Sequence, residues 1–113
     1  MTVALIGAGK YGAMFLAQAR TTEGMHVVAV ADLRVERIRS QLRAACWPEA
    51  RYSAPSVAAA LKSGGTFLMD DAETLIRAPG IEVVIEATGD PRTGIRLALA
   101  CIDARKHVVM VNA

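Results

Sequence analysis

The sequence has few aromatic residues, no long apolar run and little excess charge, and each shortage argues against a class of function. Phe, Trp and Tyr make up 4% of the 113 residues, too few for a surface on which single-stranded nucleic acid stacks. No apolar run approaches the roughly 20 residues of a membrane-spanning helix. The net charge is +2, with acidic and basic residues interspersed. We therefore expect neither nucleic acid nor a membrane as a partner.

Cysteine is also scarce, and no metal site is predicted. Cys46 and Cys101 lie far apart, and each is expected on a helix face as a buried or half-buried free thiol. Reduced thiols are typical of the cytoplasm, which is the compartment we expect. His26 and His107 each begin a predicted strand, without an acid or thiol at ligand spacing.

Apolar residues, by contrast, are abundant, at 53% of the sequence. Continuous short apolar runs are typical of parallel strands that helices cover on both faces. The runs alternate with segments of helical periodicity, which predicts right-handed crossovers and one doubly wound α/β domain with strand order 3-2-1-4-5. Strands are predicted at 2–6, 26–31, 66–69, 81–87 and 107–111, and helices at 10–20, 34–46, 71–77 and from 91 onward.

The segment 47–56 (WPEARYSAPS) interrupts this alternation with two prolines and is predicted to be irregular. Ser53 or Ala54 is expected to cap a short helix that has Pro55 at its first position and runs to Lys62.

A glycine motif follows the first predicted strand. In GAGKYG, the glycines are Gly7, Gly9 and Gly12, a spacing that is weak evidence alone. Here a strand precedes it, a helix opens within it, and Asp32 lies twenty positions beyond Gly12 at the end of the second strand. That combination is the fingerprint of a dinucleotide-binding fold.

Each residue of the motif has an expected role. Gly7 permits the tight turn, Gly9 lets backbone approach a pyrophosphate, and Gly12 lets the helix pack close to the sheet. The start of that helix offers free N–H groups to the phosphates. Asp32 is expected to accept hydrogen bonds from the ribose hydroxyls of the adenosine half.

Asp32 also bears on the choice of cofactor. Its carboxylate repels a 2′-phosphate, which favours NAD. Arg34 and Arg37 follow closely and either hold a phosphate, which keeps NADP open, or lie on the solvated face of the second helix. Lys10 either approaches the pyrophosphate or stays exposed, and Tyr11 either contacts the cofactor or packs.

The carboxyl ends of the other strands are expected at the same edge of the sheet. Thr88 and Gly89 follow the fourth strand and are expected to line the nicotinamide half of the site. The alternative is a simple turn in which Asp90 caps the next helix. Asn112 follows the fifth strand and completes the predicted cofactor site, to which no catalytic residue is assigned.

Two groups of oxidoreductases resemble this chain. GAGKYG and HVVAVADLRVER resemble the amino-terminal domain of the glucose–fructose oxidoreductase and inositol dehydrogenase-like enzymes. IEVVIEATGDPRTG and ARKHVVMVNA are closer to homoserine dehydrogenases and homoserine-dehydrogenase-like oxidoreductases, some of which carry a carboxy-terminal SAF domain. The resemblance spans nearly the whole chain and is weakest at 47–70.

The resemblance implies an NAD(P)-dependent dehydrogenase that passes a hydride between nicotinamide and a small hydroxy or carbonyl metabolite. By the match, the three glycines form the phosphate loop and Asp32 is the ribose acid. Thr88 and Gly89 match the nicotinamide-side loop. Asn112 matches the asparagine of the homoserine dehydrogenase pattern H-V-V-T-A-N-K, whereas Ala113 stands where that pattern has lysine.

Family members continue into a substrate and oligomerisation domain. We therefore expect residues 1–113 to be the dinucleotide-binding domain, a fragment that binds NAD without turnover. In the whole enzyme its partners would be a small-molecule substrate and other copies held through the missing domain. Two hypotheses stand beside this one: a non-catalytic dinucleotide-sensing module, and a Rossmann-type domain for a mononucleotide or S-adenosylmethionine.

Overall fold

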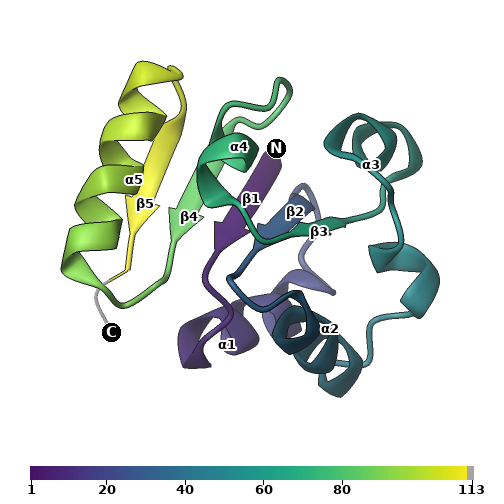
Figure 1. Ribbon diagram of the computed structural model, residues 1–113. Coiled ribbons are helices and arrows are strands. Elements are labelled where there is room, and N and C mark those ends of the chain that lie inside the picture. The colour runs from purple at the N-terminus through teal and green to yellow at the C-terminus, as the bar shows by residue number, and fades with distance from the viewer. Residues whose placement is uncertain (112–113) are drawn as a thin grey trace.

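The computed structural model describes residues 1–111 of the chain. In this range five strands form one parallel sheet in the order β3-β2-β1-β4-β5 (Figure 1). The strands are β1 (Thr2–Ile6), β2 (His26–Ala31), β3 (Phe67–Met69), β4 (Val83–Glu86) and β5 (His107–Met110). The helices are α1 (Lys10–Ala19), α2 (Val35–Ala44), α3 (Val57–Ser63), α4 (Ala72–Ile76) and α5 (Pro91–Asp103), with a 3₁₀ turn η1 (Glu49–Tyr52). The predicted fold class and strand order are confirmed.

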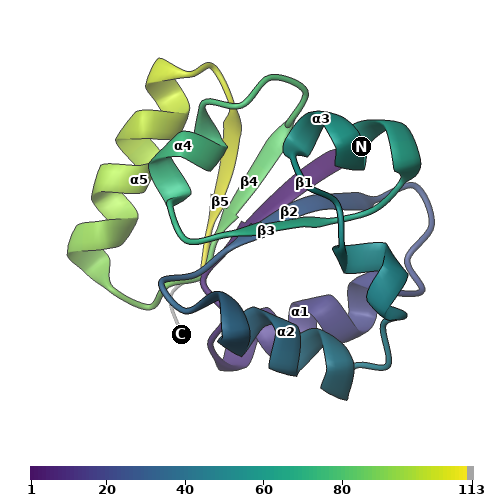
Figure 2. The ribbon, with the colours of Figure 1, turned by 45° about the vertical axis from the view of Figure 1, so that its right-hand side comes forward.

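Helices cover both faces of the sheet, α1 and α2 on one and α3, α4 and α5 on the other (Figure 2). Successive residues of a strand point to opposite faces. In β1, Val3 and Leu5 join the apolar core under α1 and α2, whereas Ala4 and Ile6 join the core under α4 and α5. This two-sided burial explains why the strands read as continuous apolar runs.

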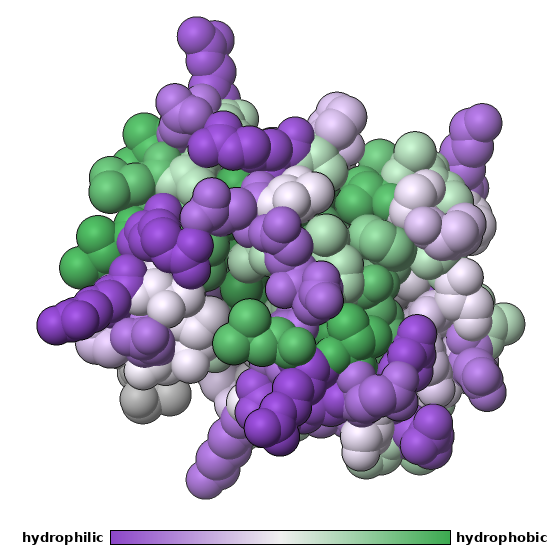
Figure 3. Space-filling view, in the orientation of Figure 1, coloured by the Kyte–Doolittle hydropathy of each residue, from purple (hydrophilic) through white to green (hydrophobic). Residues whose placement is uncertain are grey.

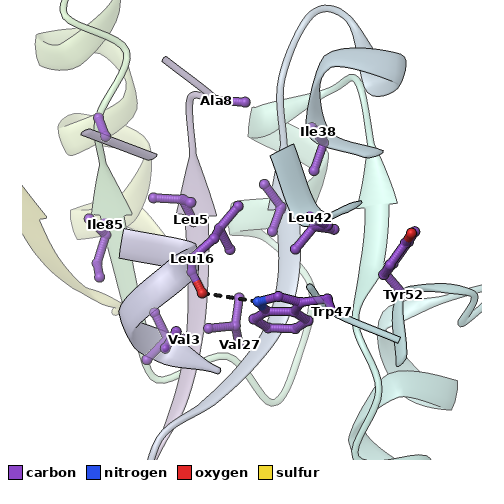
Figure 4. Packing of buried hydrophobic residues seen from close by; sticks show 13 residues of the cluster. Val3, Leu5, Ala8, Leu16, Val27, Ile38, Leu42, Trp47, Tyr52 and Ile85 are labelled. Atoms are coloured by element: carbon purple, nitrogen blue, oxygen red, sulfur yellow. Dashed lines mark hydrogen bonds between the residues drawn. The ribbon is translucent and has the colours of Figure 1, made fainter. Parts of the chain in front are cut away.

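The segment 47–56 packs against the apolar core that lies under α1 and α2. Trp47 is 5% exposed, and its indole N–H donates to the carbonyl of Leu16 at 3.0 Å (Figure 4). The Arg51 guanidinium lies over the same ring, 5.0 Å from its centre. This part of the chain, predicted to be irregular, thus contains η1 and closes one end of the core.

The prediction for the start of the helix after this segment was wrong. The N-cap of α3 is Ser56, whose Oγ accepts from the amide of Ala59 at 3.0 Å. Ala54 has no side-chain acceptor, and the Ser53 hydroxyl donates instead to the carbonyl of Glu49 at 2.7 Å. Pro55 consequently lies before the helix.

The prediction for Cys46 was also wrong, whereas Cys101 is buried as expected. Helix α2 ends at Ala44, and Cys46 follows it, exposed and with φ +63°. Its amide donates to the carbonyl of Arg43, and the next amide, that of Trp47, donates to Leu42. This pair of hydrogen bonds is a Schellman motif, in which the left-handed position usually holds glycine.

The outer face of α5 carries apolar side chains that the described residues leave uncovered. Ile95, Leu99 and Ile102 are each more than half exposed and lie one turn apart, and apolar surface is visible over this helix in Figure 3. No helix within residues 1–111 has the length and apolar character needed to cross a membrane.

Candidate functional site

The carboxyl ends of four strands surround one cleft of about 670 Å³. In doubly wound sheets, ligands bind at this edge, beyond the strand ends, and the volume suits a small-molecule ligand. The lining comes from the glycine loop, the ends of β2 and β4, and the starts of α2, α4 and α5. It comprises Ile6, Gly7, Gly9, Ala31, Asp32, Leu33, Arg34, Arg37, Asp70, Asp71, Ala72, Glu73, Ala87, Thr88, Asp90, Thr93, Arg96 and Leu97.

Two glycines of the loop are required by close backbone approach. Gly7 has φ +101°, and a Cβ there would lie 2.6 Å from the carbonyl oxygen of Ala87, just after β4. A Cβ at Gly12 would collide with the carbonyl oxygen of Gly7. The Gly7 amide also donates to the carbonyl of Ala31 at 2.8 Å. The loop is therefore fastened to the ends of both strands that flank β1.

Gly9 faces open space instead. It is the N-cap of α1, and a Cβ there would meet no atom within 4 Å. No side chain caps this helix, whereas Ser56, Asp71 and Asp90 cap α3, α4 and α5. The first amides of α1 therefore lack the side-chain acceptor that three other helices have. Uncapped amides with the helix dipole behind them favour an anion.

Asp32, at the end of β2, is 9% exposed and accepts four hydrogen bonds. Oδ1 accepts from the Ala8 amide at 3.0 Å and from Arg37 Nη2 at 2.7 Å. Oδ2 accepts from the Arg34 amide and from Arg37 Nε, both at 3.1 Å. Burial by itself would raise the pKa of Asp32, but the bonds from Arg37, Ala8 and Arg34 outweigh it and hold that pKa below its ordinary value. The carboxylate is therefore ionised at neutral pH.

The arginines after Asp32 are both exposed at the cleft, and they contact Asp32 in different ways. Arg37 lines the cleft and grips the carboxylate through both of its oxygens, a geometry that fixes its orientation as well as its charge. Arg34 also lines the cleft and contributes its backbone amide. The sequence signal for Arg37 is its place on the first turn of the helix that follows the acid.

The end of β4 holds a buried acid to which the sequence assigned no role. Glu86 is 3% exposed, and its Oε2 accepts from the amide of Thr88 at 2.8 Å and from the Thr88 hydroxyl. A Cβ at Gly94 of α5 would lie 2.6 Å from Glu86 Oε1. Gly94 thus makes room for the carboxylate, which in turn orders the loop after β4. The sequence feature that could have indicated this contact is a glycine inside the predicted helix, which is Gly94.

In the same loop, the side chain of Asp90 caps α5. Its Oδ1 accepts from the amide of Arg92 at 3.1 Å and its Oδ2 from the hydroxyl of Thr93 at 2.7 Å. The bond from Thr93 is the largest of the effects that hold the pKa of Asp90 below its ordinary value. The turn with Asp90 as a cap, considered from the sequence, is therefore present. Gly89 within it has φ +75°.

The cleft brings together only part of the predicted cofactor site. The predicted residues that line it are Gly7, Gly9, Asp32, Arg34 and Thr88. Those outside its lining are Lys10, Tyr11, Gly12 and Gly89. Tyr11 stacks on Phe15 with ring centres 6.4 Å apart, in keeping with packing, and Lys10 is exposed. Asn112 lies outside the described residues.

Charged residues of α4 and α5 also line the cleft, and of these Glu73 and Arg96 were not predicted from the sequence. Arg96 of α5 pairs with Glu73 of α4 through Nη1 and Oε1. Asp71 accepts from the hydroxyl and amide of Thr74, and the hydroxyl contributes most to a pKa below the ordinary value. From the sequence, Asp70 or Asp71 was expected both at this edge of the sheet, after the third strand, and as the cap of the next helix, and Asp71 is the cap of α4. Among the described residues, no group of three or more His, Cys, Asp and Glu is placed to hold a metal ion.

A family model described as "Oxidoreductase family, NAD-binding Rossmann fold" matches residues 1–110. No curated protein matches the sequence. Similar solved structures include a probable dehydrogenase from Thermotoga maritima, at 21% identity and a TM-score of 0.72. Another is a myo-inositol dehydrogenase from Lactobacillus casei in complex with NAD(H) and myo-inositol, at 20% identity and a TM-score of 0.71. Each match covers 97% of this chain and 27% of the other, so the chain spans about a quarter of their length.

Proposed function

The chain belongs to this oxidoreductase family with an NAD-binding Rossmann fold, and from that premise we propose how the cleft holds NAD. The pyrophosphate lies at the uncapped start of α1, against Gly9. The ribose of the adenosine half lies at Asp32, and the nicotinamide half extends toward Thr88 and Asn112. The observation that carries this placement is the uncapped helix start beside an ionised acid at the next strand end.

The ionised Asp32 supports NAD over NADP as the preferred cofactor. Its carboxylate is held in place by Arg37 and would repel a 2′-phosphate at the same position. The four donors on its oxygens already match the roughly four lone-pair sites of a carboxylate. We therefore expect a ribose hydroxyl to take over a site that the half-exposed Arg37 side chain now occupies.

We further propose that residues 1–113 are the cofactor domain of a dehydrogenase whose substrate domain lies elsewhere in the whole protein. The hydride chemistry comes from the nicotinamide, and this chain binds and orients it. We assign no catalytic acid or base to residues 1–111. The segments IEVVIEATGDPRTG and ARKHVVMVNA support a homoserine-dehydrogenase-like enzyme acting on a small hydroxy or carbonyl metabolite. The chain alone should bind NAD without turnover.

Titration with NADH, followed by fluorescence or calorimetry, tests the placement. We expect saturable binding by the wild-type chain and a large loss in Gly9→Val, because a Cβ at Gly9 would have no protein atom within 4 Å and the added side chain would occupy the space proposed for the pyrophosphate. The matched control is Gly24→Asn, in the turn before β2 at the opposite end of the sheet, which should bind as the wild type does. A folded wild-type sample without saturable binding would overturn the proposal.

A further inference from the structure

We infer that Gln41 of α2 is a positioning residue that aims the proposed pyrophosphate-binding amide of Gly9. Its side chain reaches back to the glycine loop, where Nε2 donates to the carbonyl of Ala8 and lies 3.4 Å from that of Gly9. The inference rests on the proposed function, because it concerns how the same loop meets a phosphate.

The planarity of the peptide bond links this contact to the cleft. The carbonyl of Ala8 and the amide of Gly9 belong to one trans peptide, so they point in opposite directions. By holding the carbonyl toward α2, Gln41 fixes the Gly9 N–H away from α2. It also keeps a carbonyl oxygen, which would repel phosphate, from turning toward the ligand.

The peptide between Gly7 and Ala8, which precedes this one, is also held by side chains from the end of β2 and from α2. The Ala8 amide donates to Asp32 Oδ1 at 3.0 Å, and Arg37 grips that carboxylate. Arg37 and Gln41 lie one turn apart on α2 and so share a face of the helix. Two successive peptides of the glycine loop are thereby set by side chains from the end of β2 and from α2, and Ala8 between them is fully buried.

The carbonyl oxygen of the Gln41 side chain carries a cost in stability that offsets part of what its Nε2 contributes. This oxygen, Oε1, is buried and has no hydrogen-bond partner within residues 1–111. A buried carbonyl oxygen without a partner costs stability. An apolar side chain of similar length would remove this unpartnered oxygen but would leave the buried Ala8 carbonyl without its donor. What glutamine adds at this position is the donor that reaches Ala8.

The test compares Gln41→Met, which keeps the length and removes the donor, with Gln41→Glu, which places an acceptor against the two carbonyls. NADH and ADP-ribose serve as probes, since both carry the pyrophosphate. We expect Gln41→Met to weaken both about tenfold and Gln41→Glu to weaken them more. The ¹⁵N–¹H signal of Gly9 should shift in both variants. The thermal midpoint of Gln41→Met should stay close to that of the wild type, because the variant removes the unpartnered Oε1 and leaves the Ala8 carbonyl without its donor instead. A purely structural role would lower the midpoint together with the affinity.

Arg43→Met, on the exposed side of the same helix, is the control and should bind as the wild type does. If Gln41→Met and Gln41→Glu both fold and bind within twofold of the wild type, the inference is overturned while the proposed function stands. If the wild type itself binds neither probe, the proposed function fails, and the role of Gln41 fails with it.

Discussion

Arg37 holds both carboxylate oxygens of Asp32, with Nη2 2.7 Å from Oδ1 and Nε 3.1 Å from Oδ2. The residue expected to meet the ribose is therefore also the buried carboxylate of an ion pair whose arginine is half exposed. Its Oδ1 also accepts from the Ala8 amide of the glycine loop. Changes at Asp32 should consequently affect both the choice of cofactor and the shape of the loop.

Asp32→Ser should shift the chain toward NADPH. Removing the carboxylate removes its repulsion of a 2′-phosphate and frees Arg37 to bind that phosphate. We expect the ratio of NADPH to NADH affinity to rise about tenfold or more, while NADH affinity itself falls because the Ala8 amide loses its acceptor. Fluorescence titration with both nucleotides measures this ratio. In Asp32→Ser/Arg37→Met most of the gain should vanish, and an unchanged ratio in the single variant would contradict the role of Arg37.

The same ion pair predicts a pH dependence of stability. Burial raises the pKa of Asp32, but the bonds from Arg37, Ala8 and Arg34 bring it below its ordinary value of 3.8. A lowered pKa in the folded state stabilises the fold above the unfolded value and loses that effect as the pH falls through the folded one. Urea unfolding of the wild type and Asp32→Asn should therefore give a constant difference in free energy from about pH 7 to about pH 5. That difference should shrink below about pH 4, and a gap that stays constant there would refute the prediction.

The glycines of the loop should differ sharply in their tolerance of alanine. Gly7→Ala combines a positive φ with a collision at Ala87, so we expect it to cost about 2 kcal/mol or more of unfolding free energy. Gly9→Ala should cost about 1 kcal/mol or less, which is the difference between glycine and alanine at an N-cap. The control is Gly24→Ala, which has φ +77° but no neighbour within 4 Å, so it measures the cost of the φ alone. Equal losses in Gly7→Ala and Gly24→Ala would show that the approach to Ala87 adds nothing.

Cys46→Gly should stabilise the chain. Cys46 adopts the left-handed conformation after α2, where a side chain costs about 1 kcal/mol relative to glycine. We expect a gain of about 1 kcal/mol in unfolding free energy, visible as a higher thermal midpoint. Cys46→Ala removes the thiol but keeps the Cβ, so it should show no such gain. A similar rise in both variants would assign the effect to the thiol instead of the backbone.

Residue patterns predicted the sheet because each strand is an apolar run long enough to be buried on both faces. They also placed Gly7, Gly9 and Asp32 correctly relative to one another, since strand ends of a parallel sheet meet at one edge. They did not reveal the bonds of Gln41 to Ala8 or the packing of Glu86 against Gly94. Such contacts depend on how a helix is rotated against the loop, which apolar periodicity leaves open.

The boundaries near 47–56 were missed for a different reason. Helix α2 ends in a left-handed residue that is not glycine, so the usual signal was absent. The cap of α3 is Ser56, whereas the Ser53 hydroxyl donates to the carbonyl of Glu49 in η1. The sequence does not show which of these serines makes which bond. The expectation for Asn112 stays a prediction, because that residue lies outside the described range.

The fastening of the glycine loop also bears on the thermodynamics of binding. Gly7 lies against Ala87 and donates to Ala31, so the loop is already ordered before any ligand arrives. A preorganised loop surrenders little conformational entropy when it closes on a phosphate. The affinity of this chain for a dinucleotide should therefore reflect the contacts it makes, with little of that free energy spent on shaping the site.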